Sequence, residues 1–312
     1  MIATITLNPS IDQHIVISHL LKDDANRALS VESHAGGKGA NVSRVVRELG
    51  GPTHAYTLQA GFIGKFWSSE LSKLDVAFTA HEVEGETRIN TVLTDTKDKT
   101  QTRISALGPV ISKKDQRLFL QKLLRVRPKP FCWVLGGSPS RGMRHDIYQN
   151  YIHGLQKTGV PCILDADNEA LACGVQAGPF LIKPNEFEMR RLAGRKLSTI
   201  EDYRVAAGEF VQKGIRIVIV SLGKNGALLV SEKESFHVKG IPAPVKSKVG
   251  AGDSLLGGFA LGCLKKMSLE KSLALGVAAS TSAVMREAPR LCLRSDIPDL
   301  LKKIKICRLG RP

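Results

Sequence analysis

The sequence has no run of apolar residues near the roughly 18 that would span a bilayer. Its first residues, MIATITLNPSID, are typical of a strand and not of a signal peptide, so we expect a cytoplasmic protein. The six cysteines show neither the paired spacing of a zinc site nor the density of a disulfide scaffold, which favours reduced thiols. The eight histidines form no His-Glu-x-x-His pattern, and no structural zinc site is indicated.

Aromatic residues make up only 5% of the chain, and the 29 acidic residues are outnumbered by 45 Lys and Arg. The resulting charge of +16 could indicate a nucleic-acid binder, but the basic residues are spread along the chain and no recognition helix or stacking signature appears. A positive field also speeds the encounter with phosphorylated metabolites. We therefore expect a small anionic substrate as partner, and neither nucleic acid nor a membrane.

Strand-like and helix-like runs alternate along the 312 residues. Short apolar runs, each followed by Gly, Asn or Asp, are IATITL, FCWVLGG, PCILDA, FLIKPN and RIVIVSLG. Helices are predicted for KGANVSRVVRELGG, which ends at Gly50 and Gly51, and for STIEDYRVAAGEFVQKG, which begins at Ser198 or Thr199. This alternation predicts a single α/β domain, a doubly wound, mainly parallel sheet flanked by helices.

Two regions interrupt the alternation. SIDQHIVIS and the stretch AFTAHEVEGETRINTVLTDTKDKTQTRISALG are rich in Thr, Val and Ile with a period of two. They follow one another without crossover helices, so they are not expected to join the parallel sheet. We predict a small antiparallel sheet from residues of about 10–33 and 76–107 that covers the main domain as a lid.

The stretch VGAGDSLLGGF places glycines, an acid and a hydroxyl before an apolar run. If a helix begins near Gly252, the free amides of Gly250, Ala251 and Gly252 form an anion site. A carboxylate at that place, Asp253, would repel a phosphate, but it makes sense as a base that takes a proton from an alcohol during phosphoryl transfer. The alternative is a tight turn with Asp253 as a helix-capping acid.

A second glycine-rich turn, AGGKGANVSR, precedes the first predicted helix. It lacks both the Gly-Lys-Ser/Thr of a Walker loop and the Gly-x-Gly-x-x-Gly of a dinucleotide site. The two glycine segments, in this order, resemble the signatures of the phosphofructokinase-B group of ribokinase-like carbohydrate kinases. The resemblance covers nearly the whole chain and extends to TLNPSID, GETRIN, LIKPNEFE, SLGKNGA and PAPVKSKVGAGDS. These segments look like the branch that phosphorylates phosphosugars, namely 6-phosphofructokinases, 1-phosphofructokinases and tagatose-6-phosphate kinases.

The resemblance implies a ribokinase-like fold, ATP as donor and Mg²⁺ as cofactor. It implies that Asp253 is the catalytic base and that Gly250, Ala251 and Gly252 form its anion hole. The substrate-binding residues that it implies are Asp12, Arg27, Gly37, Lys38, Asn41, Arg88, Arg103 and Ser138. For Asp12 a turn-forming role after Pro9 is the alternative, and for the arginines it is simple surface solvation.

For the nucleotide, the resemblance implies contacts from Lys183, Asn185, Ser221, Gly223, Gly226 and Ser280. Asn185 and Glu188, one helical turn apart after Pro184, would hold the Mg²⁺ largely through waters. The alternatives are a capped helix start at Asn185 and an ordinary hairpin turn at SLGKNG.

The chain departs from the family pattern at Lys65, Trp67 and Ser68, and again at Pro139, Ser140 and Arg141. We expect the second group to shape the sugar pocket differently. We also expect a homodimer formed through the lid, because pairing would cover the exposed face of a small sheet.

The function that the sequence favours is ATP-dependent phosphorylation of a ketohexose phosphate, with fructose 6-phosphate as the first choice of acceptor. The basis for this choice is Arg103, at a position where 1-phosphofructokinases usually carry Glu, together with the late stretches GVAASTSAV and PRLC. Fructose 1-phosphate and tagatose 6-phosphate remain alternatives. A non-catalytic module that binds sugar phosphates or nucleic acid is the alternative from another class.

Overall fold

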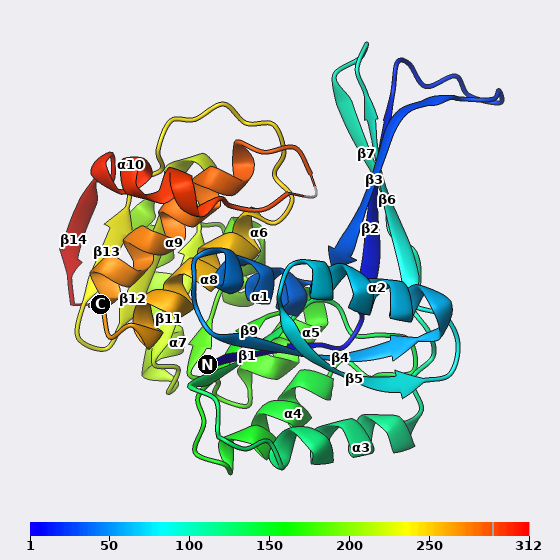
Figure 1. Ribbon diagram of the computed structural model, residues 1–312. Helices are drawn as coiled ribbons and strands as arrows, with labels where there is room; N and C mark the ends of the chain where they lie inside the picture. The colour runs from blue at the N-terminus through cyan, green and yellow to red at the C-terminus, as the bar shows by residue number, and fades with distance from the viewer. Residues whose placement is uncertain (289, 312) are drawn as a thin grey trace.

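The computed structural model describes residues 1–288 and 290–311. A ten-stranded sheet crosses the larger part of the molecule (Figure 1). In spatial order its strands are β14 (Ile306–Gly310), β13 (Ser235–Val238), β12 (Ala227–Ser231), β11 (Ile217–Ser221), β10 (Leu181–Ile182), β9 (Cys162–Asp165), β8 (Cys132–Gly136), β1 (Ile2–Thr6), β4 (Thr53–Ala60) and β5 (Ala77–Val83). The strands from β11 to β5 run parallel to one another, so their carboxyl ends share one edge.

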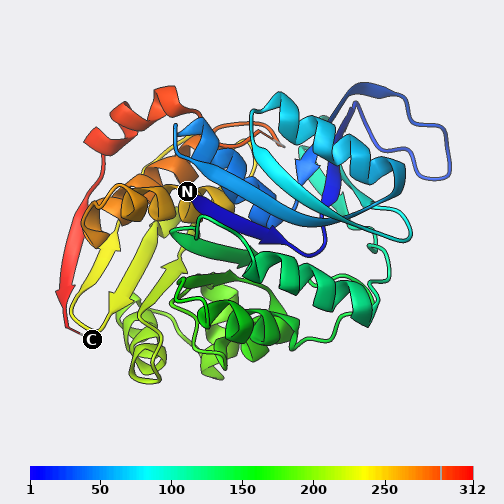
Figure 2. The same cartoon turned by 60° about the horizontal axis from the view of Figure 1, so that its bottom comes forward.

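Helices cover both faces of this sheet (Figure 2). One face carries α1 (Lys38–Glu48), α2 (Gly61–Lys73), α8 (Ala251–Leu264), α9 (Leu269–Val284) and α10 (Ile297–Lys302). The other carries α3 (Lys113–Leu124), α4 (Ile147–Gln156), α5 (Asn168–Val175), α6 (Glu186–Ala193) and α7 (Ile200–Gln212). Two short 3₁₀ helices are η1 (Gly223–Asn225) and η2 (Arg294–Asp296). The predicted doubly wound α/β architecture is thus confirmed.

Successive residues of the parallel strands pack alternately into the hydrophobic cores on the two faces of the large sheet, because these strands are buried on both faces. Val134 packs in the core that includes α8 and α9, whereas its neighbour Leu135 packs with α4 and α7. Both predicted helices are present. The capping box of Thr199 and Asp202 opens α7, and α1 ends just before Gly50, whose φ is 77°. Within the described residues, no helix has the length and apolar character needed to cross a membrane.

A four-stranded sheet extends away from the body at the upper right of Figure 1. Its strands, in order, are β3 (Ala28–Gly36), β2 (Ser10–Ile17), β6 (Arg88–Asp95) and β7 (Thr100–Ile104). The pairs β2–β3 and β6–β7 are antiparallel, as expected. The central pair, β2 with β6, is parallel, because the chain passes through α1, β4, α2 and β5 between the two hairpins.

The predicted boundaries of the small sheet differ from the structure at β5. Residues Ala77–Val83 pair with β4 in the large sheet and do not join the small one. Helix α2 is the reason, because it serves as the crossover that a parallel neighbour of β4 needs. The sequence also did not predict the antiparallel extension β12, β13 and β14 at the opposite edge.

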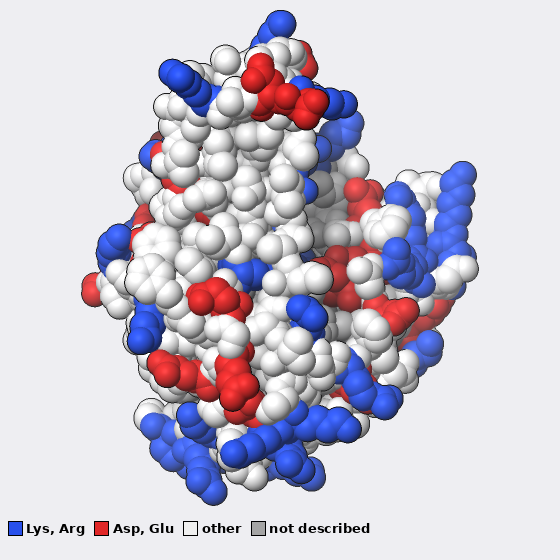
Figure 3. Space-filling model, turned by 90° about the vertical axis from the view of Figure 1, so that its right-hand side faces the viewer, with Lys and Arg blue, Asp and Glu red and all other residues white. Residues whose placement is uncertain are grey.

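The positive charge is less evenly spread than the composition suggested. Figure 3 shows Lys and Arg gathered at the lower end of the viewed face, the end where α3 lies in Figure 1. The segment KKDQRLFLQKLLRVRPK (113–129) contains seven Lys or Arg and one acid, and all seven basic residues are exposed. This part of the surface therefore attracts anions.

Candidate active site

The two glycine turns of the sequence lie next to each other. One leads into α1 and the other into α8, and Asn41 Nδ2 of α1 donates a hydrogen bond of 2.8 Å to Asp253 Oδ2 of α8. Gly250 is the N-cap residue of α8 and has a φ of 76°, a conformation that glycine adopts without steric cost. The helix start that the sequence predicted after this turn is confirmed.

The amino end of α8 is open to a ligand. No side chain caps it, and the amides of Ala251 and Gly252 have no hydrogen-bond partner among residues 1–288 and 290–311. Such free amides, at the positive end of a helix dipole, bind anions. The helix start that follows Gly250 therefore leaves the amides of Ala251 and Gly252 free, as the predicted anion hole requires; that role stays a prediction.

Asp253 is the third residue of α8, and its side chain is buried. Burial raises the pKa of Asp253 to about 6, and the nearby charge of Asp165 adds to the rise, while Lys38 and the hydrogen bond from Asn41 oppose it. A carboxyl with this pKa is ionised at neutral pH yet binds a proton more readily than an ordinary aspartate. These properties suit a general base.

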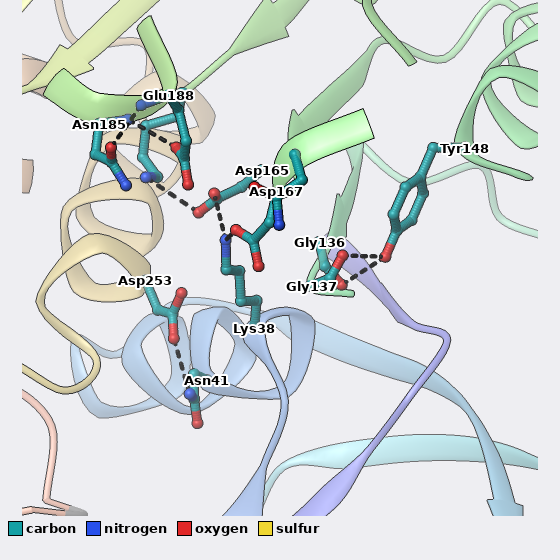
Figure 4. Close-up of polar contacts among 12 residues, drawn as sticks. Lys38, Asn41, Gly136, Gly137, Tyr148, Asp165, Asp167, Asn185, Glu188 and Asp253 are labelled. Atoms are coloured by element: carbon teal, nitrogen blue, oxygen red, sulfur yellow. Dashed lines mark hydrogen bonds and ion pairs between the residues drawn. The ribbon is translucent and has the colours of Figure 1, made fainter. Parts of the chain in front are cut away.

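Charged side chains cluster near Asp253: Figure 4 labels Lys38, Asp165 and Asp167, and Lys183 pairs with Asp165. Lys38 Nζ lies 3.1 Å from Asp165 Oδ1 and 2.6 Å from Asp167 Oδ1. Lys183 Nζ lies 3.2 Å from the other carboxylate oxygen of Asp165. Burial opposes ionisation of Asp165, yet Lys183 and Lys38 together hold its pKa below the ordinary value. The site thus contains two lysine side chains, each ion-paired with Asp165, near the open end of α8.

Asp165 and Asp167 were not among the residues predicted from the sequence. Asp165 ends β9 and Asp167 follows two residues later, at the sheet edge where ligands of open α/β sheets bind. The signal was present in PCILDAD, an apolar strand that ends in acids. That these acids belong to the site follows only from the position of β9 between β8 and β10, and sequence patterns do not give the strand order.

Asp12 lies in β2, where its Oδ1 accepts hydrogen bonds from Ser10 Oγ (2.8 Å) and Asn90 Nδ2 (2.9 Å). The turn-forming alternative for Asp12 is therefore wrong, because the residue is inside a strand. Gly36 permits this arrangement, since a methyl group there would overlap the Asp12 carboxylate. Asp12 and Asn41 thus lie on the two sides of the first glycine turn, which includes Gly37.

Trp67, one of the departures from the family pattern, supports the same turn. Its side chain is fully buried, and Nε1 donates a hydrogen bond of 2.9 Å to the carbonyl of Gly36. Ser68 Oγ bonds Gln59 Oε1 at 2.6 Å, whereas Lys65 is exposed. The tryptophan therefore supports the backbone of Gly36, the residue that lies against Asp12.

The three predicted arginines have different surroundings. Arg88 begins β6 and donates to the backbone carbonyls of Asn8 and Ala106. Arg103 is exposed on β7 and lines a narrow crevice with Asp12 and with Val249 of the glycine turn. Arg27 is exposed at the far end of the β2–β3 hairpin from Asp12. Within one chain the fold brings Arg88 and Arg103 toward the site, but not Arg27.

The loop after β8 carries Ser138, which is half-buried, and the unusual residues 139–141. The Pro139 carbonyl accepts from Asn8 Nδ2 at 3.3 Å, and Ser140 Oγ donates to the Pro109 carbonyl at 2.9 Å. Arg141 forms an isolated bridge with Val110. These contacts connect the loop to Asn8, after β1, and to Pro109 and Val110, after β7.

The predicted nucleotide side lies at the ends of β10 and β11. Asn185 is the N-cap of α6 and forms a capping box with Glu188, so the capped helix start considered for this motif is present. Asn185 also bridges Ser221 at the end of β11, and Gly223 and Gly226 adopt positive φ in the following η1 turn. That turn joins the antiparallel strands β11 and β12, as a hairpin does. Ser280 is half-buried on α9.

Known proteins share this arrangement. The model of the pfkB family carbohydrate kinases matches residues 5–296. The chain belongs to this family. It is 31% identical over 309 residues to the 1-phosphofructokinase of Bacillus subtilis, covering 99% of this chain and 100% of that protein. It is 32% identical over 299 residues to the ATP-dependent 6-phosphofructokinase isozyme 2 of Escherichia coli, covering 95% and 96%.

A solved structure agrees with these relatives. Phosphofructokinase-2 from Escherichia coli in complex with fructose-6-phosphate superposes with a TM-score of 0.90 at 31% identity, covering 96% of this chain and 98% of that one. This pfkB kinase is accordingly a phosphofructokinase-type phosphotransferase that acts on an alcohol group of a sugar, with ATP as phosphate donor. The predicted family, ribokinase-like fold and reaction class are confirmed.

Proposed function

We propose that this kinase transfers the γ-phosphoryl group of ATP to a ketohexose phosphate, with fructose 6-phosphate as acceptor and fructose 1,6-bisphosphate as product. The observation that carries the proposal is Asp253, a buried carboxylate with a raised pKa at the uncapped amino end of α8. The sugar hydroxyl gives its proton to Asp253, its oxygen forms the new bond to phosphorus, and the bond to the β-phosphate oxygen breaks. The free amides of α8 stabilise the charge on the phosphoryl oxygens.

The remaining predicted residues have roles that fit this reaction. Asp12 and Asn41 offer an acceptor and an amide for sugar hydroxyls. Arg88 and Arg103 approach from the small sheet, which we propose acts as the lid, and would bind the phosphate that the substrate already carries. Arg88 is half-buried, and its Nε has no hydrogen-bond partner among the described residues. Burial lowers the pKa of Arg88. A bound phosphate would accept a hydrogen bond from Nε and favour the charged guanidinium.

The donor set also fits Mg²⁺ at Glu188. Its Oε2 accepts the Asn185 amide, while Oε1 has no hydrogen-bond partner among the described residues. Burial raises the pKa of Glu188, and a hard cation would relieve that cost because it favours the ionised form. Bound Mg²⁺ would neutralise charge on the nucleotide phosphates.

The choice of acceptor is tested by steady-state kinetics. The purified kinase is offered fructose 6-phosphate, fructose 1-phosphate and tagatose 6-phosphate, with unphosphorylated fructose and a nucleoside as controls. We expect the highest kcat/KM with fructose 6-phosphate, because Arg103 lies near Asp12, and little activity without a substrate phosphate. A preference for fructose 1-phosphate would instead identify the protein as a 1-phosphofructokinase. If no acceptor were phosphorylated, a non-catalytic binding module would be favoured.

We also propose a homodimer formed through the small sheet. Leu29 and Val31 of β3 and Ile104 of β7 are each more than half exposed, and pairing with a second copy would cover them. One solved structure of Escherichia coli phosphofructokinase-2 is described as a tetrameric inhibited form. Light scattering at assay concentration should give twice the chain mass of 33.8 kDa, and Leu29→Lys with Val31→Lys should shift it to one chain mass. A wild-type monomer would refute the dimer.

A further inference from the structure

Arg44 lies on α1 three residues after Asn41, so the two side chains share one face of the helix. Its Nη1 donates a hydrogen bond of 3.1 Å to Asn41 Oδ1 and one of 3.0 Å to the backbone carbonyl of Ala35, in β3. One nitrogen of the guanidinium thus holds both the Asn41 side chain and the strand that precedes the first glycine turn. Arg44 was not among the site residues predicted from the sequence.

The bond from Arg44 decides which way the Asn41 amide faces. A side-chain amide has an acceptor at one end and donors at the other. With Oδ1 bound to the guanidinium, Nδ2 is directed at Asp253 and donates to its Oδ2 at 2.8 Å (Figure 4). The reverse orientation would place an amide oxygen against the carboxylate and N–H donors against a guanidinium, which accepts no hydrogen bond. The hydrogen bonds therefore run in one direction, from Arg44 through Asn41 to Asp253.

This chain of hydrogen bonds leaves one oxygen of Asp253 for the substrate. Oδ2 accepts from Asn41, whereas Oδ1 has no hydrogen-bond partner in the part of the chain that the structure describes. Asn41 is 7% exposed and Asp253 is 8% exposed, so water has little access with which to replace the bond between them. The oxygen that remains to accept a proton from the sugar hydroxyl is Oδ1.

Arg44 is charged although the protein encloses its guanidinium. Burial lowers the pKa of Arg44 to about 10, while the charges of Asp12, Asp253, Glu70 and, least of these, Cys292 oppose the fall. A guanidinium with this pKa is protonated at neutral pH. It therefore adds a positive charge near the base, and a nearby positive charge favours the ionised form of a carboxyl.

We propose that Arg44 is a positioning residue for the proton transfer: it fixes the Asn41 amide, which occupies Oδ2 of Asp253 and leaves Oδ1 to accept the proton of the sugar hydroxyl. This inference rests on the proposed role of Asp253 as the base. In the transfer the O–H bond of the sugar breaks, the proton passes to Oδ1, and the sugar oxygen bonds to phosphorus as the β-phosphate oxygen leaves. Arg44 and Asn41 keep their protons throughout.

The test compares Arg44→Met and Arg44→Lys with the wild-type protein, and adds Asn41→Ala alone and combined with Arg44→Met. Arg47→Met is the matched control, because Arg47 lies on the same helix but is exposed and pairs with Asp75. For each variant, kcat and kcat/KM with the best acceptor are measured across the acid limb of the pH profile. Calorimetry gives the affinity for a non-hydrolysable ATP analogue, and thermal unfolding verifies that each variant is folded.

We expect Arg44→Met to lower kcat by about 10 to 10² while the affinity for the ATP analogue stays within about threefold. The acid limb of kcat/KM should move to higher pH by about 0.5 to 1 unit, because Asp253 loses a directed donor and a nearby positive charge. Arg44→Lys keeps a charge and a donor and should restore part of both effects. Arg47→Met should match the wild type.

The pH shift is assigned by comparison between variants. The other charged groups that act on Asp253, namely Asp165, Lys38 and Lys183, are the same in every variant. The substrates are also the same, so their own ionisation contributes equally to each profile. A difference in the acid limb therefore reports on the base and not on a general loss of stability.

The double variant shows whether Arg44 acts through Asn41. When Asn41 is already replaced by alanine, removing Arg44 should lower kcat by less than about threefold further, because residues in one hydrogen-bond network do not act additively. Fully additive losses in the double variant would overturn the proposal, since they would make the effect of Arg44 independent of Asn41.

Other results would also contradict it. An unshifted acid limb in Arg44→Met with a loss of stability alone would make the guanidinium a structural contact of the glycine turn. A raised KM for the sugar phosphate with unchanged kcat would assign Arg44 to Asp12 instead. If Arg44→Met does not fold, Arg44→Lys carries the same test with a smaller shift of the same sign. Normal turnover in Asp253→Asn would instead refute the proposed function, and it is measured first.

Discussion

We expect Asp253→Asn to lower the turnover number by about 10² to 10⁴ while ATP and the sugar phosphate still bind. The amide keeps the shape of the carboxylate and its contact with Asn41, but it cannot accept the proton of the sugar hydroxyl. Steady-state kinetics give the turnover, and calorimetry gives the two affinities. Normal turnover in the variant would remove Asp253 from the mechanism.

The chain offers a matched control for the capping alternative. Asp202 is also the third residue of its helix, α7, and serves there as a capping acid. Asp202→Asn should lower stability only slightly and leave turnover unchanged. If both variants showed only this small loss of stability, Asp253 would be an ordinary helix-terminal acid.

The pH profile reports on the same carboxyl. Because burial raises the pKa of Asp253 to about 6, the base is ionised above that pH and protonated below it. Activity should therefore be lost on acidification, with kcat/KM falling by about tenfold per pH unit well below pH 6. Residual activity of Asp253→Asn should lack this acid limb. A wild-type profile that is flat from pH 7 down to pH 5 would contradict the assignment.

Trp67→Ala should lower the free energy of unfolding by about 3 to 5 kcal/mol. The indole is fully buried against Leu71 and Val76, lies edge-on to Phe78 at 6.2 Å, and bonds the Gly36 carbonyl. Its removal leaves a cavity behind Asp12 and takes one hydrogen bond from the Gly36 carbonyl. Chemical denaturation measures the stability, and KM for the sugar phosphate should rise because the first glycine turn loses its support.

Two further variants separate the causes. Phe62 lies on the same helix, α2, but is 77% exposed, so Phe62→Ala should change stability by less than about 0.5 kcal/mol. Trp67→Phe keeps much of the volume and removes the hydrogen bond, for an expected loss of about 1 to 3 kcal/mol. A Trp67→Ala variant as stable as Phe62→Ala would show that the tryptophan is dispensable to this core.

Local patterns were enough for the parts of the fold that local chemistry decides. The strands of the parallel sheet are apolar on both faces, so runs such as RIVIVSLG identified β11 without knowledge of its neighbours. The capping box at Thr199 and the glycine turn before Asp253 are formed by residues within a few positions of each other. The period-two pattern of β5 was assigned to the small sheet because periodicity identifies a strand but not the strand with which it pairs.

The sequence by itself determined the class of sheet, the two glycine turns and the acid at the start of α8, because these depend on backbone freedom, apolar periodicity and helix capping. Only the tertiary structure decided that Lys38, Asp165 and Lys183 meet, and that Arg27 lies away from Asp12 in its own chain. Arg27 and Asp12 lie at opposite ends of one hairpin. The contacts of Asp165 join β9 to Lys38, which is 127 positions away in the sequence, and to Lys183, which directly follows the neighbouring strand β10. Their formation depends on strand order and on burial of charge, which no local pattern encodes.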